Sequence, residues 1–342
     1  MNALLYSENL IVNVITGLLA LAVLVLSADV AVNKLVSLAN YFNLSTTFVG
    51  MTVVSIATSI PEITAHLTAS VGILRGTLDY QVGSAVVLGA NIGSDVVQQT
   101  LIMGLVVLVA GSLYFRRYFL WKSLLPMIAA AVVCLILGLN GRYSRLDGLI
   151  LFGLFVAYTY YLYVDERKHF PGASAPAEAE EGQKIETPRQ AWVAAGITVG
   201  AMMLSVLSAQ IVLERTEWIV QITGIGGSLI GVVTLGVASA LPELTTALSG
   251  LKHRAHGISL GTLVGSNITN PLLGIGLGAM VSTYWVPKPF ILWDLPWQAG
   301  AGALLLGFLL WRKGRIGRIG SAYFIALYVL YIVVRVTFFA VD

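Results

Sequence analysis

Long apolar runs separated by short polar breaks dominate the chain. Ten such runs have approximate limits at 9–33, 46–74, 81–111, 119–139, 146–164, 191–213, 227–251, 258–283, 291–311 and 319–339. A helix needs roughly 20 apolar residues to cross the hydrocarbon core of a membrane, and these runs are of about that length or longer. The pattern therefore predicts an all-α membrane protein with about ten transmembrane helices.

Polar residues gather in one longer stretch, at 165–189, which is rich in Ala, Glu, Pro and Gly. This composition is typical of a tether rather than of a folded domain. We expect a cytoplasmic linker here, between a first five-helix unit at 1–164 and a second at 190–342. The first span continues past residue 25 without a small-residue cleavage site, so we expect it to be retained.

Composition agrees with this organisation. Hydrophobic residues make up 57% of the chain and charged residues 11%, with a mean hydropathy of +0.84. The net charge of +3 does not indicate nucleic-acid binding, because the basic residues sit in loops or close to span ends. Cys134 is the only cysteine, which excludes an intrachain disulfide and a cysteine metal cluster.

One short segment occurs twice. ATSIPEIT at 57–64 reappears as ASALPELT at 238–245, and GANIGSD at 89–95 is followed in the second half by the similar GSNITN at 265–270. The chain therefore consists of two related halves. Each half places one glutamate, Glu62 or Glu243, inside a long apolar run, where an ionised group is costly unless something compensates its charge.

The basic residues predict the orientation of the spans. With both termini outside the cell, fourteen of the 20 Lys and Arg residues fall on the inner side, as the positive-inside rule favours. The other six are Arg75, Arg142, Arg145, Arg215, Lys288 and Arg335. Because five spans are an odd number, the second half enters the membrane inverted, and inverted repeats are typical of alternating-access transporters. We expect a multi-pass protein of the inner (plasma) membrane.

A proline interrupts the second and seventh spans. Pro61 and Pro242 cannot donate a helical hydrogen bond to the carbonyls of Ala57 and Ala238, so each helix should break near the bilayer midplane. Free carbonyls at this depth are tolerated only where they face protein or an aqueous cavity.

Oxygen-bearing side chains accompany the breaks. They are Thr58, Ser59 and Glu62 in the first half and Ser239 and Glu243 in the second, with Ser94 and Asn270 at equivalent places in the next spans. Two carboxylates with hydroxyl and carbonyl oxygens suit Ca2+, which takes about 6–8 oxygen ligands. Smaller sets of these oxygens suit Na+ or a proton.

These paired motifs resemble the two repeats of the sodium/calcium exchanger family, in its compact prokaryotic form. The resemblance covers essentially the whole chain. It implies that Ca2+ is held at the centre by Glu62 and Glu243 with backbone oxygens of Thr58 and Ser239. It also implies flanking sodium sites that use Ser59 and Ser266.

The sequence departs from the family pattern at these flanking sites. The position that should complete the Ser59 site is Ala90, and the one that should complete the Ser266 site is Ala240. The central pair, often Asn and Asp in the family, is Ser94 and Asn270, with an extra acid at Asp95. The driving ion therefore stays open between Na+ and H+, and we expect Ca2+ transport without a cofactor.

Two other function classes fit less well. An intramembrane hydrolase would need a catalytic arrangement such as HExxH, a Ser-His pair or GxGD, which the sequence lacks. A cation channel usually builds its filter from a symmetric oligomer, whereas here one chain supplies both halves of the pocket. Asp29 fits either a functional acid or an ion pair with Lys34, and His66 either a proton relay or a hydrogen-bonded structural group.

Overall fold

The structure is a computed structural model that describes residues 10–41, 55–115, 117–169, 185–252 and 256–342. Five helical spans come from the first half: α2 (Leu10–Tyr41); α4 (Ser55–Thr58) with α5 (Ile60–Arg75); α6 (Tyr80–Val97), η2 (Gln98–Ile102) and α7 (Met103–Ala110); α8 (Arg117–Phe119), η3 (Leu120–Leu124) and α9 (Leu125–Gly138); and α10 (Arg145–His169).

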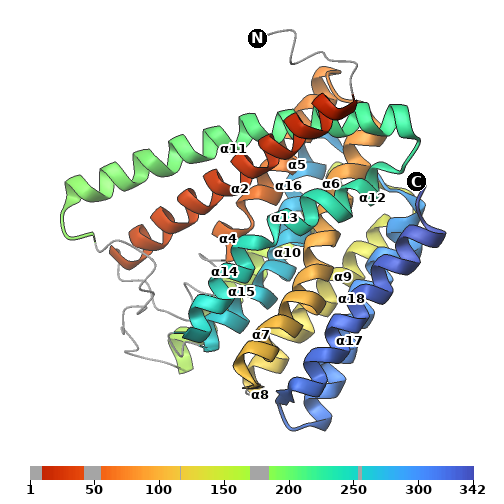
Figure 1. The fold of residues 1–342 in the computed structure, drawn as a ribbon. Coiled ribbons are helices and arrows are strands. Elements are labelled where there is room, and N and C mark those ends of the chain that lie inside the picture. Colours follow the sequence, from red (N-terminus) through yellow and green to blue (C-terminus); the bar gives the residue numbers. More distant parts are fainter. Residues whose placement is uncertain (1–9, 42–54, 116, 170–184, 253–255) are drawn as a thin grey trace.

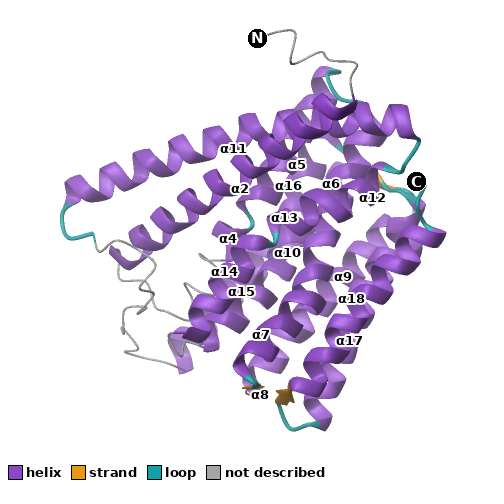
Figure 2. Cartoon of the chain, in the orientation of Figure 1, coloured by secondary structure: helices purple, strands orange, loops and turns teal. Residues whose placement is uncertain are grey.

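Five more come from the second half: α11 (Pro188–Thr223); α12 (Gly227–Gly231), η4 (Val232–Gly236), α13 (Val237–Ser239) and α14 (Leu241–Lys252); α15 (His256–Thr269), η5 (Asn270–Ile275) and α16 (Gly276–Ser282); η6 (Phe290–Asp294) and α17 (Leu295–Trp311); and α18 (Arg318–Phe338). The η elements are single π-helical turns. Figure 2 shows that helices make up most of the described chain.

The predicted all-α membrane architecture of about ten spans is confirmed. Seven of the described helical stretches are long and apolar enough to cross a membrane by length and composition. The second span is not among them, because α5 has only 16 residues after the break at Ser59.

The first and sixth spans are longer than predicted. α2 has 32 residues and α11 has 36, against expected limits of 9–33 and 191–213. At about 1.5 Å per residue they measure roughly 48 and 54 Å, more than the hydrocarbon thickness of about 30 Å. They lie side by side and obliquely across the remaining helices (Figure 1). Ser27 and Ser205 hydrogen bond across this pair at 2.8 Å.

Two of the arginines counted on the outer side, Arg215 and Arg335, are buried within helices. The Arg215 side chain of α11 donates to Asn13 Oδ1 of α2 at 2.7 Å. Arg335 of α18 is fully buried and paired with Asp294. Both arginines were counted with the residues that set the orientation, and the structure shows that a basic residue close to a span end can also be neutralised inside the protein.

Two short sheets establish the relative direction of the halves. β1 (Ser112–Tyr114) pairs with β4 (Arg315–Gly317), and β2 (Arg142–Tyr143) pairs with β3 (Tyr284–Trp285). The fourth span, which ends in α9, leaves the β1/β4 sheet and arrives at β2/β3. The ninth span, which ends in α17, starts from β3 and arrives at β4. Equivalent spans of the two halves therefore run in opposite directions, as inversion requires.

Glycines let the two halves meet closely at their centre. A Cβ atom added at Gly89 of α6 would lie 2.1 Å from the Ser228 carbonyl oxygen, and one at Gly231 of α12 would lie 2.2 Å from the Val86 carbonyl oxygen. Gly93 and Gly236 have similarly close backbone neighbours. Small residues at such crossings are what membrane helix packing favours, and this contact carries the third span against the seventh.

We predict that Gly231→Ala lowers the thermal stability of the purified protein. The added methyl would push α12 away from backbone atoms of α6, and overpacking of this kind costs typically about 1–3 kcal/mol. Gly300→Ala on α17 is the matched control, since no atom lies within 4 Å of a Cβ there. Equal melting temperatures for the two variants in detergent would contradict the close contact.

Candidate functional site

The breaks in the second and seventh spans have nearly the same backbone geometry. Ser59, between α4 and α5, has φ −81° and ψ 5°, and Ala240, between α13 and α14, has φ −82° and ψ −4°. Both values lie in the sparsely populated bridge region. The predicted interruption before Pro61 and Pro242 is therefore present in both halves, in the middle of the bundle (Figure 2).

Glu62 lies in the first turn of α5 and is 2% exposed. Its Oε1 accepts a hydrogen bond from the Ser94 hydroxyl of α6 at 2.7 Å. Ser239 of the opposite half also interacts with this carboxylate. Its Oε2 accepts no hydrogen bond from the described residues.

Glu243 occupies the equivalent place in α14 and is fully buried. Thr58 and Ser266 lie near its carboxylate and hydrogen bond to each other at 3.2 Å. Neither carboxylate oxygen of Glu243 is aligned for a hydrogen bond within the described part of the chain. Each glutamate thus meets hydroxyl groups from the other half, and the two carboxylates are close enough to repel each other.

Asp95 and Asn270 extend this layer. Asn270 Nδ2 donates to Asp95 Oδ1 at 2.8 Å, and Gln298 Nε2 donates to Asp95 Oδ2 at 2.6 Å. Gln298 belongs to α17, a span in which the sequence analysis identified no functional residue. The structure thus brings Asp95 into direct contact with a predicted site residue, Asn270, and adds Gln298 from a helix outside the two repeat motifs.

The flanking positions differ between the halves. The Ser59 hydroxyl is buried and has no hydrogen-bond partner among the described residues. The Ser266 hydroxyl, in contrast, hydrogen bonds to Thr58. Ala90 and Ala240 are both buried, with 2% and 0% exposure. A hydroxyl at either position would therefore lie inside the protein, where these alanines provide none.

Further amide side chains that the sequence analysis passed over link the helices around the site. Gln98 donates to Ser94 Oγ at 3.0 Å and accepts from Asn267 at 2.9 Å. Gln99 donates to Asn267 Oδ1 at 2.7 Å, and Asn91 donates to the Asn270 carbonyl at 2.9 Å. The signal for these residues was present, since amides are rare in apolar spans and these lie inside or just after the repeated motifs.

His66 and Asp29 have local partners. His66 is 1% exposed, and its ring nitrogens contact the Tyr284 hydroxyl at 3.1 Å and Asn91 Nδ2 at 3.2 Å. His66 is therefore hydrogen-bonded on both ring nitrogens, an arrangement that both alternatives allow. Asp29, half-buried on α2, accepts a hydrogen bond from Asn33 at 3.2 Å.

The chemistry of the site is that of buried oxygen atoms. No basic side chain of the described residues forms a hydrogen bond or ion pair with Glu62, Glu243 or Asp95. In the same ranges, no three His, Cys, Asp or Glu side chains converge as a metal centre. A cation here would therefore be held by few carboxylates and several hydroxyl, amide and carbonyl oxygens, a ligand set that suits a transiently bound hard ion.

Comparisons with known proteins agree with this picture. A sequence model of the family described as sodium/calcium exchanger protein matches residues 12–164 and 193–337. The inner membrane protein YrbG of Escherichia coli (strain K12) is 28% identical over 271 residues, which cover 78% of each chain. The sodium/calcium exchanger MaX1 of Methanosarcina acetivorans is 25% identical over 329 residues, covering 87% of this chain and 91% of that protein.

The fold is also similar to that of a solved exchanger. The sodium-calcium exchanger NCX_Mj, soaked with 100 mM Na+ and 10 mM Sr2+, superposes with a TM-score of 0.61 at 22% identity, covering 95% of this chain and 99% of that one. The extent of the family match over both halves, with this shared fold, leads to one conclusion. The chain belongs to the sodium/calcium exchanger protein family, whose members are cation antiporters and not enzymes.

Proposed function

We propose that the chain exchanges Ca2+ for Na+ across the membrane by alternating access. One observation carries the proposal: two buried glutamates, one from each inverted half, lie together without a basic partner among the described residues. A pair of carboxylates at membrane depth needs a counter-charge, and Ca2+ supplies two charges at once. The names of MaX1 and NCX_Mj, both sodium/calcium exchangers, support this choice of ions.

In this proposal Glu62 and Glu243 are the charged ligands of Ca2+. Thr58 and Ser239, the last residues of the helices that end at each break, supply backbone oxygens. Ser94 and Asn270 line the centre, where Ser94 already donates to Glu62. Ser59 and Ser266 contribute hydroxyls to flanking monovalent sites. The unpartnered oxygens of Glu243, Glu62 and Ser59 support this assignment, because buried polar atoms normally have a partner.

Inversion supplies the mechanism of access. Because equivalent spans run in opposite directions, a movement that opens the pocket to one side in one half corresponds to opening on the other side in the other half. The same ligands then face either side in turn. Ca2+ leaves on one side, and the driving ion replaces its charge before the pocket returns.

H+ is the alternative driving ion. Ala90 and Ala240 remove one hydroxyl from each flanking site, and this favours weak sodium binding. In the alternative mechanism Glu62 and Glu243 are neutralised by protons when Ca2+ leaves, and the net charge of the pocket is balanced in both states.

We further propose an orientation with both termini outside the cell and the segment 165–189 as a cytoplasmic linker between units at 1–164 and 190–342. The excess of Lys and Arg on the cytoplasmic side supports this orientation. The name of the relative YrbG, an inner membrane protein, supports the choice of membrane.

This orientation predicts that a membrane-impermeant thiol reagent labels a cysteine introduced at 170–184 only from the cytoplasmic side. Native Cys134 is buried and should stay unlabelled. Labelling of the introduced cysteine from outside intact cells would contradict the proposed orientation.

We predict that Glu62→Gln and Glu243→Gln each reduce the initial rate of Ca2+ uptake into proteoliposomes roughly a hundredfold. The change removes one charged ligand and keeps the side-chain shape, and losing a charged hydrogen-bonding partner costs on the order of 3 kcal/mol. Glu214→Gln on α11 is the matched control, because it is the same change at a partly exposed glutamate that hydrogen bonds to Gln210 of its own helix and is not part of the proposed pocket. Normal uptake by either pocket variant would rule out the pocket.

A further prediction addresses the missing hydroxyls. The double variant Ala90→Ser and Ala240→Ser should make Ca2+ transport more strongly dependent on Na+, because each flanking site gains an oxygen ligand. The measurement is the Na+ concentration that gives half-maximal Ca2+ flux at fixed pH, and this concentration should fall. Ala69→Ser, also at a fully buried alanine, serves as the control. If the double variant and the control have the same half-maximal Na+ concentration, the two missing hydroxyls do not determine sodium coupling.

A further inference from the structure

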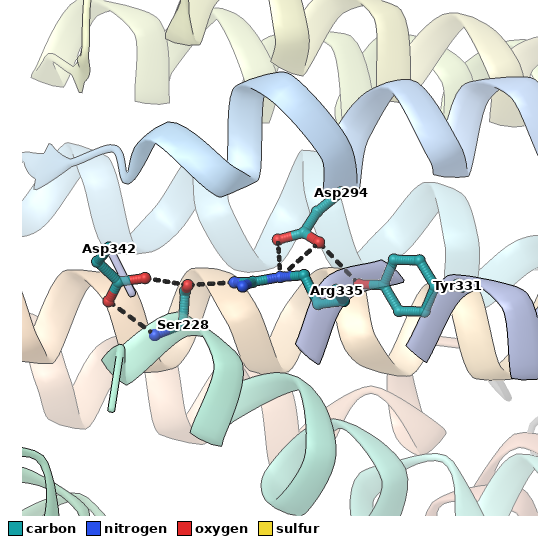
Figure 3. A network of polar contacts seen from close by, with 5 residues as sticks. All are labelled: Ser228, Asp294, Tyr331, Arg335 and Asp342. Carbon is teal, nitrogen blue, oxygen red and sulfur yellow. Dashed lines mark hydrogen bonds and ion pairs between the residues drawn. The ribbon is translucent and has the colours of Figure 1, made fainter. Parts of the chain in front are cut away.

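The protein holds buried acids in two different ways. Asp294, at the end of η6, is fully buried and accepts hydrogen bonds from Arg335 Nε at 3.0 Å and from the Tyr331 hydroxyl at 2.9 Å. Arg335 also donates to Ser228 Oγ, and Ser228 bonds Asp342 (Figure 3). Here a fixed cation of the protein balances the carboxylate, and the ion pair joins α18, η6 and α12.

Asp95 is equally buried but has no such partner. Its two oxygens accept hydrogen bonds only from uncharged amides, Asn270 and Gln298, among the described residues. Amide dipoles reduce the cost of a charge at this depth but do not cancel it. Asp294 has the guanidinium of Arg335 as its counter-charge, and among the described residues Asp95 has none.

The two amides carry a further sign of an ion site. Asn270 Oδ1 and Gln298 Oε1 are buried and have no hydrogen-bond partner in the described part of the chain, although both side chains are at most 1% exposed. Rotation of an amide by half a turn exchanges its N–H donors for its carbonyl oxygen. The same two groups that now donate to Asp95 would then present oxygens beside its carboxylate.

We propose that Asp95, Asn270 and Gln298 form a subsite for one monovalent alkali cation beside the Glu62–Glu243 pocket. One negative charge with two neutral amide oxygens balances a single positive charge, whereas Ca2+ takes about 6–8 oxygens and more than one charge. The inference rests on the proposed antiport function. It adds α17, which lies outside the two repeat motifs, to the helices that bind ions.

The subsite has no counterpart in the other half of the chain. Leu125-Pro126 and Leu295-Pro296 occupy equivalent places at the starts of α9 and α17, so the residue that corresponds to Gln298 is Ile128. The residue after Asn270 is Pro271, where the first half has Asp95 after Ser94. The subsite therefore occurs once per chain, and it makes the two related halves unequal in ion binding.

The test measures ion binding by thermal stabilisation of the purified protein in detergent. A ligand that binds the folded state raises the melting temperature by mass action. Na+ is titrated against choline at constant ionic strength, and Ca2+ is titrated separately. The variants are Asp95→Asn, which keeps the side-chain shape, and Gln298→Leu, which removes the amide. Gln99→Leu is the matched control, because Gln99 is a buried amide on the adjoining turn that bonds Asn267 and not Asp95.

We expect both variants to need about tenfold more Na+ than the unmodified protein for the same shift, as loss of one hydrogen-bonding ligand of a charged group implies. Their Ca2+ shifts and the Na+ response of the Gln99→Leu control should stay unchanged. An unaltered Na+ titration in Asp95→Asn and Gln298→Leu, or an equal loss in the control, overturns the subsite. If neither ion stabilises the unmodified protein, the antiport function itself fails instead.

Discussion

The cost of a carboxylate in the membrane interior is the constraint on which this structure depends. Four acids of the described residues are at most 2% exposed: Glu62, Asp95, Glu243 and Asp294. Of these four, only Asp294 has a basic partner within the described residues, and its ion pair with Arg335 joins helices rather than lining the pocket. The other three sit around the two helix breaks and the neighbouring spans, where a mobile cation can supply the missing charge. Transport and structural stability thus follow from the same electrostatic requirement, met in two different ways.

Inverted duplication places these groups together. The breaks at Ser59 and Ala240 share their backbone conformation, and each presents its glutamate to hydroxyls of the opposite half. Glycines at the crossing of α6 with α12 bring the backbones of the two halves into direct contact. Glu62 then meets Ser94 of its own half and Ser239 of the opposite half. A bulkier crossing would separate the halves and with them the two carboxylates.

The sequence was sufficient for the architecture because its signals are local. Apolar length predicts each span, and Pro61 and Pro242 predict the breaks within a residue or two. The repeated Pro-Glu motif predicts that two acids face each other. Contacts between distant spans were not predictable in this way. Gln298 of the ninth span contacts Asp95, and Arg335 of α18 pairs with Asp294 of η6. The rotation and tilt of the packed helices determine which side chains meet in this way. The partner of Arg215 was not predictable for the same reason, since Asn13 lies on another long helix.

The central claim, that a mobile cation compensates the buried carboxylates during transport, is tested most directly by radiolabelled Ca2+ flux in proteoliposomes of the unmodified protein, with Na+ and pH gradients imposed one at a time. The account predicts that Ca2+ accumulates against its own gradient when an opposing Na+ gradient is applied at fixed pH, while a pH gradient without Na+ gives the same result only if protons drive exchange. Ca2+ movement that follows its own gradient alone, unaffected by either opposing gradient, would contradict it.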